Sequence, residues 1–172
     1  SKAAKWAEKL GAEVLPTGSL RLRKSVQISA LNGYEEGDWW VQDAAAALPV
    51  AVLNPQPGES ILDMCAAPGG KTMQLAASGA VVTALDASAT RMQRVKENLV
   101  RTRLAATLCV EDALAHSGGP YDAILLDVDN GPNAMVCETN ASLYSKNGIR
   151  SICSALKNSG RLVVCLLYTS DA

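Results

Sequence analysis

The sequence has little material for sites built on histidine and cysteine. His116 is the single histidine, which leaves no partner for a Ser-His-Asp or Cys-His triad and disfavours hydrolase chemistry of that kind. No Cys-x-x-Cys spacing occurs, so we expect neither disulfides nor a metal site. Any nucleophile must therefore be activated in another way. The five cysteines are scattered along the chain at Cys65, Cys109, Cys137, Cys153 and Cys165.

Long apolar runs and targeting segments are also missing. The longest apolar run, Ala44–Leu53, has ten residues and contains Pro49, whereas a helix that crosses a bilayer needs about 20 apolar residues. The chain opens with Ser-Lys-Ala-Ala-Lys-Trp, which is neither an apolar signal core nor an Arg-rich and Ser-rich transit segment. We therefore expect no membrane association and a cytoplasmic location. We also expect the chain to be a fragment of a longer protein.

Charge is distributed unevenly, although the net charge is only -1. Residues 1–24 hold six Lys and Arg against two Glu, and residues 91–103 hold five against one. Residues 111–139 hold six acids and no Lys or Arg. This pattern indicates a face for a polyanion and a separate pocket for a cationic or hydroxyl-rich ligand. Ordinary solvated helix faces are the alternative interpretation.

The 172 residues, of which 48% are hydrophobic, suffice for one domain with a core. Residues 1–54 are predicted to form a basic N-terminal extension with a helix, short extended pieces at 19–23 and 26–31, and a second helix at 44–53. Residues 55–172 are predicted to form a ligand-binding domain in which apolar strands alternate with helices, so the fold class is α/β with a parallel-rich sheet covered by helices on both faces. Strands are expected at 61–62, 80–85, 106–110, 123–126 and 162–167, and helices at 71–77, 89–101 and 142–156.

Acidic residues follow the ends of the predicted strands, where open parallel sheets bind their ligands. The first strand runs into residues 63–72, a turn of small residues and glycines in which backbone N–H groups can approach a ligand. Asp86 ends the second strand, 23 residues after Asp63, at a spacing suited to the hydroxyls of an adenosine ribose. Asp112 follows the third strand, and Asp127 ends the fourth.

The glycine spacing separates two classes of cofactor. A dinucleotide site needs Gly-x-Gly-x-x-Gly around a pyrophosphate, and Ala66-Ala67-Pro68 breaks that spacing. A sulfonium nucleoside is positively charged and carries no phosphate. Acids at the strand ends therefore favour S-adenosylmethionine.

Two motifs carry a family resemblance: Trp-Trp-Val-Gln-Asp-Ala at residues 39–44 and Cys-Ala-Ala-Pro-Gly-Gly-Lys at residues 65–71. With them, residues 20–127 resemble the Sun (RsmB, Nop) family of S-adenosylmethionine-dependent RNA cytosine-5 methyltransferases. The resemblance implies a Rossmann-like class I methyltransferase fold, S-adenosylmethionine as cofactor and an RNA partner, ribosomal RNA in particular. Carried over by position, the family's cofactor contacts fall on Cys65, Ala66, Ala67, Pro68, Gly69, Gly70, Lys71, Asp86, Asp112 and Asp127.

The resemblance breaks at the two cysteines of the family. Cytosine C5 is a poor nucleophile, so the family's chemistry requires a thiolate that adds to C6. Asn130 and Leu167 stand at the two positions where the family has cysteine. Cys165 precedes Leu167 by two residues, on the same face of a strand, and is a candidate for a displaced nucleophile; a buried, inert thiol is the alternative. The sequence thus predicts impaired turnover.

The last quarter of the chain leaves other functions open. Its segment from Asp127 to Gly148 is similar to the polyamine (spermidine) synthase-like branch of the same fold class, in which an acid takes a proton from an attacking amine. Asp127 or Asp129 could fill that role in an amine-directed aminopropyl- or methyltransferase. A module that binds cofactor or RNA without catalysis is the third alternative. Residues 166–172 fit neither family, so the C-terminal end is atypical and could be a joined segment.

Overall fold

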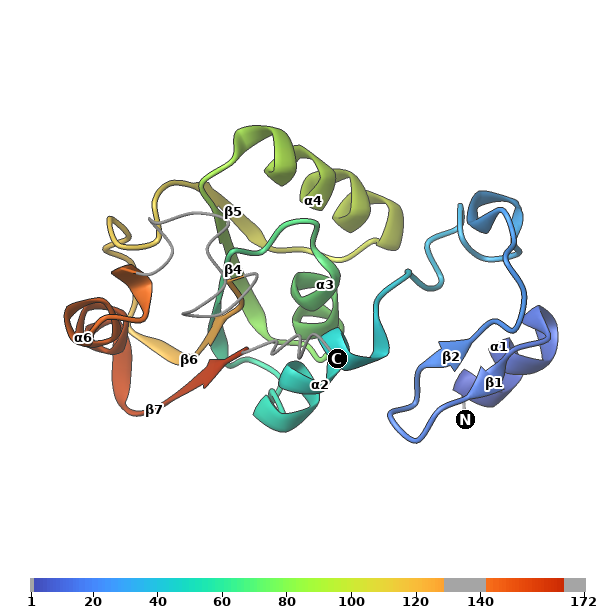
Figure 1. Cartoon of the computed structure of the whole chain (residues 1–172), viewed down its shortest axis with the longest axis horizontal. Helices are drawn as coiled ribbons and strands as arrows, with labels where there is room; N and C mark the ends of the chain where they lie inside the picture. Colours follow the sequence, from blue (N-terminus) through green and yellow to red (C-terminus); the bar gives the residue numbers. More distant parts are fainter. Residues whose placement is uncertain (1, 129–141, 166–172) are drawn as a thin grey trace, which may run out of the picture.

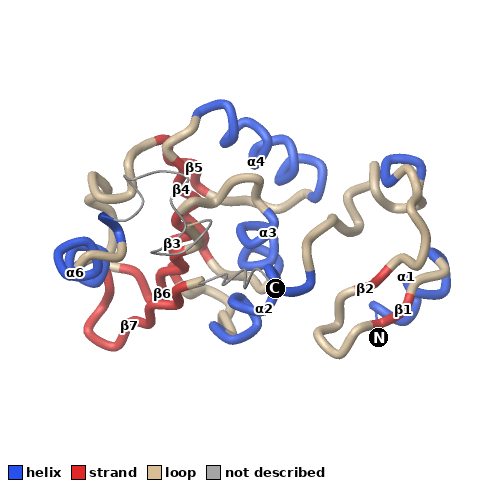
Figure 2. The backbone as a smooth tube through the Cα atoms, in the orientation of Figure 1, coloured by secondary structure: helices blue, strands red, loops and turns tan. Residues whose placement is uncertain are grey.

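The structure, a computed structural model, describes residues 2–128 and 142–165. Figures 1 and 2 show a main sheet flanked by helices, with the N-terminal helix and hairpin at the end of the molecule away from α6. In chain order the elements are α1 (Lys2–Leu10), β1 (Glu13–Val14), β2 (Leu20–Arg21), a 3-10 helix (Ile28–Ala30), α2 (Ala44–Leu53), β3 (Ser60–Met64), α3 (Gly70–Ala77), β4 (Val81–Asp86), α4 (Ala89–Thr102), β5 (Thr107–Val110), β6 (Tyr121–Leu126), α6 (Lys146–Ser154) and β7 (Leu156–Val164).

The main sheet of the described residues is parallel, with the strand order β5-β4-β3-β6-β7. The strand order reverses at β3, because β4 and β5 extend to one side of it and β6 and β7 to the other. Open α/β sheets bind ligands at such a reversal, outside the carboxyl ends of the strands. The predicted parallel α/β fold is confirmed.

Alternating residues of each central strand build two separate cores. Ile61 packs with Leu75 of α3 and Val50 of α2, whereas Leu62 packs on the other face with Ile152 of α6. Figure 1 shows α3 and α6 on opposite sides of the sheet. Helices therefore cover both faces, which explains why the strands are apolar throughout.

Helix α2 begins and ends at residues with capping conformations. The side chain of Asp43 accepts a hydrogen bond from the Ala45 N–H at 2.7 Å and caps the first turn. Asn54 ends the helix in the left-handed conformation with a φ of 50°. The buried Val50 and Leu53 dock α2 on the same core as α3. The predicted division after residue 54 stays a prediction.

Two predicted elements differ in the structure. The extended piece predicted at 26–31 contains the 3-10 helix at its centre: the N–H groups of Ala30 and Leu31 bond to carbonyls three residues back, while Gln27 and Leu31 on either side are extended. The helix predicted at 142–156 is shorter, since Ser145 caps α6 through a hydrogen bond from the Gly148 N–H at 3.0 Å, and β7 begins at Leu156. Local hydrogen bonding decides both cases. In the described part of the chain, every helix is too short or too polar to span a membrane.

A linker, residues 31–43, connects the 3-10 helix to α2 and is docked on the C-terminal end of α4. The Arg101 guanidinium donates hydrogen bonds to the carbonyl oxygens of Tyr34 at 2.5 Å and Trp39 at 3.1 Å, and stacks 4.0 Å from the centre of the Tyr34 ring. Gly37 has a φ of +73°, and a Cβ there would lie 1.8 Å from the Arg101 carbonyl oxygen. The linker backbone thus approaches α4 more closely than any other residue type would allow.

We predict that Gly37→Ala destabilises the protein more than Gly58→Ala. Gly58 shares the positive φ, at +83°, but faces open space, so it reports the backbone strain alone. Overpacking against α4 adds about 1 to 3 kcal/mol to the loss of unfolding free energy at Gly37. Urea unfolding of both variants measures the difference, and equal losses would contradict the close docking.

Candidate functional site

The loop between β3 and α3 is held in an unusual backbone path. Cys65 has a φ of 64° and Gly69 a φ of 103°, both in the left-handed region. The loop is fixed from two sides, since the Ala67 N–H donates to Asp86 at 3.3 Å and the Asn98 amide donates to the Pro68 carbonyl at 3.1 Å. Strained, over-determined loops of this kind are typical of ligand sites.

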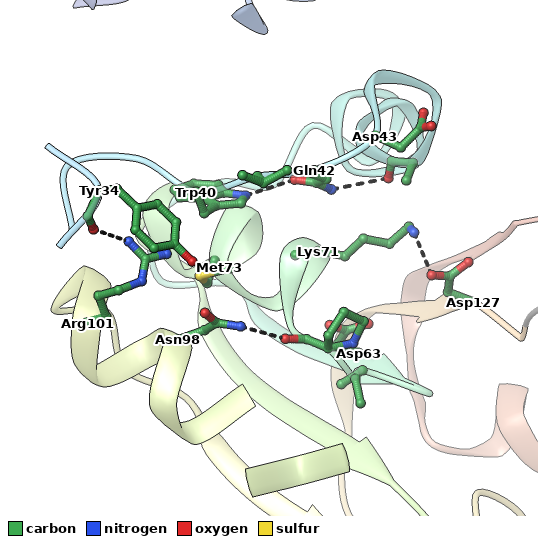
Figure 3. A pocket seen from close by; sticks show the side chains of 16 residues that line it. Tyr34, Trp40, Gln42, Asp43, Asp63, Lys71, Met73, Asn98, Arg101 and Asp127 are labelled. Atoms are coloured by element: carbon green, nitrogen blue, oxygen red, sulfur yellow. Dashed lines mark hydrogen bonds and ion pairs between the residues drawn. The ribbon is translucent and has the colours of Figure 1, made fainter. Parts of the chain in front are cut away.

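A cavity of about 360 Å³ lies beside this loop, at the N-terminus of α3 (Figure 3). The linker forms one wall, and the carboxyl ends of β3 and β6 lie at the other side, near Lys71 and Asp127. Its size suits a small-molecule ligand. It is lined by Tyr34, Trp40, Val41, Gln42, Asp43, Ala46, Asp63, Ala66, Ala67, Pro68, Gly70, Lys71, Met73, Asn98, Arg101 and Asp127.

Lys71 and Asp127 form the charged centre of the cavity. The Lys71 ammonium lies 2.5 Å from the Asp127 carboxylate, and the two side chains are only 13% and 19% exposed. Lys71 comes from the first turn of α3 and Asp127 from the residue after β6, so the strand reversal brings them together. The pair is a partly desolvated, charge-assisted contact that a polar ligand can reach.

Asp63 lies beneath this pair, in β3, and is fully buried. One carboxylate oxygen accepts a hydrogen bond from the Thr72 hydroxyl at 2.6 Å, and the other has no partner among the described residues. Burial raises the pKa of Asp63 from its ordinary 3.8 to about 7, with a smaller contribution from the charge of Asp127. The sequence analysis did not place Asp63 among the cofactor contacts. No motif in the sequence indicates that this residue of an apolar strand lines a cavity.

Asp86 is equally buried but fully engaged. Its carboxylate accepts hydrogen bonds from the N–H groups of Ala67 and Ser88 and from two guanidinium nitrogens of Arg91, the closer at 2.7 Å. It does not line the cavity, and neither do Cys65 and Gly69. Asp86 therefore ties the loop to the end of β4, and its contact with a ribose stays a prediction.

Asp112 is exposed and lies outside the cavity. Its carboxylate accepts a hydrogen bond from the Leu114 N–H at 2.8 Å, which closes a local turn. Its neighbour Glu111 pairs with His116 at 2.5 Å, and His116 in turn lies 2.9 Å from the Tyr121 hydroxyl. Of the predicted cofactor contacts, the structure thus gathers Ala66, Ala67, Pro68, Gly70, Lys71 and Asp127 around one cavity.

The linker wall is the part that sequence reasoning missed. Gln42 accepts a hydrogen bond from the Trp40 indole at 3.0 Å and donates one to Gln74 at 3.2 Å, which fixes the Trp40 ring at the cavity. Gln42 and Trp40 belong to the motif at residues 39–44, which was the available signal. The sequence counts Arg101 with the basic segment 91–103, but its guanidinium binds the linker carbonyls instead.

Cys165 is buried directly after β7, in the core shared with α2 and α3, and does not line the cavity. Desolvation, followed by the charge of Asp127, raises the pKa of its thiol to about 12. The thiol therefore stays protonated at neutral pH. Of the other two catalytic candidates, Asp127 pairs with Lys71 at the cavity and Asp129 lies outside the described residues, as do the replaced cysteine positions Asn130 and Leu167. Within the described ranges, no group of three or more potential metal ligands comes together.

The fold is shared with solved methyltransferase structures. A methyltransferase homologue from Pyrococcus horikoshii superposes with a TM-score of 0.77 at 25% identity, covering 96% of this chain and 60% of its own. NSun6 from Pyrococcus horikoshii, solved with SFG, gives 0.69 at 26% identity over 84% of this chain and 42% of its own. The fold and the cavity at the strand reversal thus define a Rossmann-like methyltransferase domain.

Sequence comparison narrows this class to one family. The family model described as 16S rRNA methyltransferase RsmB/F matches residues 50–165. Ribosomal RNA small subunit methyltransferase B of Cronobacter sakazakii is 46% identical over 115 residues, and that of Xylella fastidiosa is 41% identical over 127 residues. The chain belongs to the RsmB/F family, which confirms the resemblance that its motifs indicate. The matched region makes up 63% and 68% of this chain but only 27% and 30% of the two relatives, so the chain spans less than a third of their length.

We predict that the stability of the wild-type protein falls as the pH rises from about 4 to about 7, relative to Asp63→Asn. The folded state binds a proton at Asp63 more tightly than the unfolded state, so folding favours the protonated form. The expected difference is on the order of a few kcal/mol, levelling off above about pH 7. Urea unfolding of both proteins across this range measures it, and parallel pH profiles would show that Asp63 is not desolvated.

Proposed function

We propose that this chain binds S-adenosylmethionine at the carboxyl ends of β3, β4 and β6. The observation that carries the proposal is the charge at the strand ends, where three carboxylates, Asp63, Asp86 and Asp127, are buried or half-buried. Of the two cations beside them, Lys71 pairs with Asp127 and Arg91 with Asp86. This excess of one carboxylate, together with a buried acceptor that has no partner among the described residues, suits a cationic ligand. The solved structure of NSun6 with SFG supports a cofactor of this class.

The residues present fit this cofactor. The loop 65–71 offers backbone close to the cavity, and Lys71 with Asp127 offers a polar pair for the amino acid end of the cofactor. Asp86 would hold the ribose after Arg91 gives up one of its contacts. When bound, S-adenosylmethionine supplies an electrophilic methyl group. The chain's own part is to orient the cofactor and to exclude water beneath the linker.

We predict that Asp86→Ala weakens S-adenosylmethionine binding by about ten- to a hundredfold, because hydrogen bonds to a charged group contribute about 1.5 to 3 kcal/mol. Isothermal titration calorimetry measures the affinity. Asp122→Ala is the matched control: Asp122 also accepts a backbone hydrogen bond, from Ser60, and pairs with a cation, Lys157, but at the other end of the sheet. Equal affinities in the two folded variants would remove Asp86 from the site.

We further propose that the substrate is RNA, and ribosomal RNA in particular. Cytosine C5 is the methyl acceptor that the family resemblance implies, and we expect turnover at this atom to be impaired in this chain. Membership of the RsmB/F family supports this substrate class. The cytoplasmic location expected from the sequence stays a prediction, which a ribosomal substrate supports. No observation among the described residues favours transfer to an amine, since Asp127 is held by Lys71 rather than free to act as a base.

The basic extension is the proposed contact with the RNA backbone. Lys2, Lys5, Lys9, Arg21, Arg23 and Lys24 are exposed on α1 and around the β1-β2 hairpin. We predict that charge reversal at Lys2, Lys5 and Lys9 weakens RNA binding and lowers its salt dependence, because fewer counterions are released. Filter binding over a salt series measures both, with reversal of Lys146 and Arg150 on α6 as the control. An unchanged salt slope would leave the extension as a solvated surface.

Chemistry at C5 requires a thiolate, and the two cysteines next to the strand ends, Cys65 and Cys165, are poor sources of one. Burial and nearby carboxylates raise the pKa of both Cys65 and Cys165 to about 12. With Asn130 and Leu167 at the two cysteine positions of the family, we predict no covalent adduct between this chain and RNA that contains 5-fluorocytosine, in the presence of cofactor. Denaturing electrophoresis detects the adduct. An adduct that disappears in Cys165→Ala would contradict this prediction and identify Cys165 as the nucleophile.

A further inference from the structure

The free oxygen of Asp63 is the feature of the cavity that the proposed function does not yet explain. Asp63 is fully buried, its Oδ1 has no hydrogen-bond partner among the described residues, and the residue lines the cavity. Buried acceptors are almost always paired in folded proteins, so an unpaired one beside a cavity points to a ligand or to a bound proton. The partner of its Oδ2, the Thr72 hydroxyl, holds the carboxyl group in place at 2.6 Å.

The groups around Asp63 leave its charge uncompensated. Lys71 of α3 faces it but pairs with Asp127, which follows β6, at 2.5 Å. Asp86 of β4 faces it from the other side and pairs with Arg91 at 2.7 Å. The remaining titratable neighbours are the thiols of Cys65 and Cys165, which are neutral. Lys71 and Arg91 are thus each paired with another carboxylate, and neither is paired with Asp63.

We propose that Asp63 selects the cofactor by charge: it releases its proton to solvent when a cationic sulfonium cofactor enters the cavity, and it takes a proton back when the sulfur is neutral. The proposal rests on the proposed cofactor site and deepens it. No direct contact is needed, because a cation above a buried carboxyl group stabilises the ionised form through a poorly screened interior.

Two observations support this coupling. The pKa of Asp63 is raised to about 7, mainly by desolvation, so its proton can be exchanged near neutral pH. Methyl transfer converts the sulfonium of the cofactor into the neutral thioether of S-adenosylhomocysteine, so the charge that favours the ionised carboxylate is lost with the methyl group. Product would then bind more weakly than substrate in the ionised state, which favours exchange of product for fresh cofactor.

The test is isothermal titration calorimetry of the whole chain with S-adenosylmethionine and with S-adenosylhomocysteine, each in two buffers of different ionisation enthalpy. At about pH 6, the wild-type protein is expected to release close to one proton more with S-adenosylmethionine than with S-adenosylhomocysteine. At about pH 8 the difference should shrink, because Asp63 is then already ionised. The two ligands carry the same amino acid end, so the comparison concerns chiefly the sulfur.

Two variants separate Asp63 from its surroundings. Asp63→Asn keeps the shape and the contact with Thr72 but holds no titratable proton, so the difference between the two ligands should vanish. Thr72→Val keeps the carboxyl group and removes the hydrogen bond that favours its ionised form, so proton release should persist to higher pH. This second variant keeps the test decisive if Asp63→Asn does not fold.

Equal proton release with both ligands, or an unchanged difference in Asp63→Asn, would overturn the proposal while leaving the cofactor site intact. Absence of binding by either ligand to the wild-type protein would instead overturn the proposed function, and the charge selection with it. A tenfold or greater preference for S-adenosylmethionine at about pH 8 that is lost in Asp63→Asn would support both.

Discussion

The reversal of strand order at β3 is the constraint on which the site depends. Because β4 and β6 lie on opposite sides of β3, the loop after β3 sits between the carboxyl ends of its two neighbours, and the ends of three strands meet at one crevice. Asp63, Asp86 and Asp127 come from these three strands or directly after them. Their charges are brought together by topology, although they are far apart in the sequence, and the cations of Lys71 and Arg91 hold two of them.

The linker turns this crevice into a cavity. It is attached at one end by Arg101 and by the close approach of Gly37 to α4, and at the other by Gln42, which reaches Gln74 of α3. These contacts are mostly hydrogen bonds from side chains to backbone or to other side chains, together with the packing of the partly buried Trp40 against a cluster on α3 and α4. Such attachments open more easily than the core, so the cavity has a wall that can admit a ligand without unfolding the sheet.

Much of the fold follows from the sequence, and the site follows in part. Apolar strands such as residues 123–126 identify a doubly covered sheet on their own, and the string at residues 65–71 identifies the loop. The state of each acid does not follow, because it depends on partners from other elements: Arg91 engages Asp86, while one oxygen of Asp63 has no partner in the part of the chain that the structure describes. The contacts of Arg101 could not be predicted for the same reason. From the sequence alone, an arginine that binds the backbone carbonyls of the linker cannot be distinguished from an arginine exposed on the surface.

The most direct test of this account is hydrogen exchange of the chain with and without S-adenosylmethionine. If the cofactor occupies the cavity, protection should increase at residues 63–72 and in the linker, which form opposite walls, and should stay unchanged in α1 and α6. Slower exchange only in the basic extension, or no change at saturating cofactor, would contradict the assignment of the cavity at the strand reversal as the cofactor site.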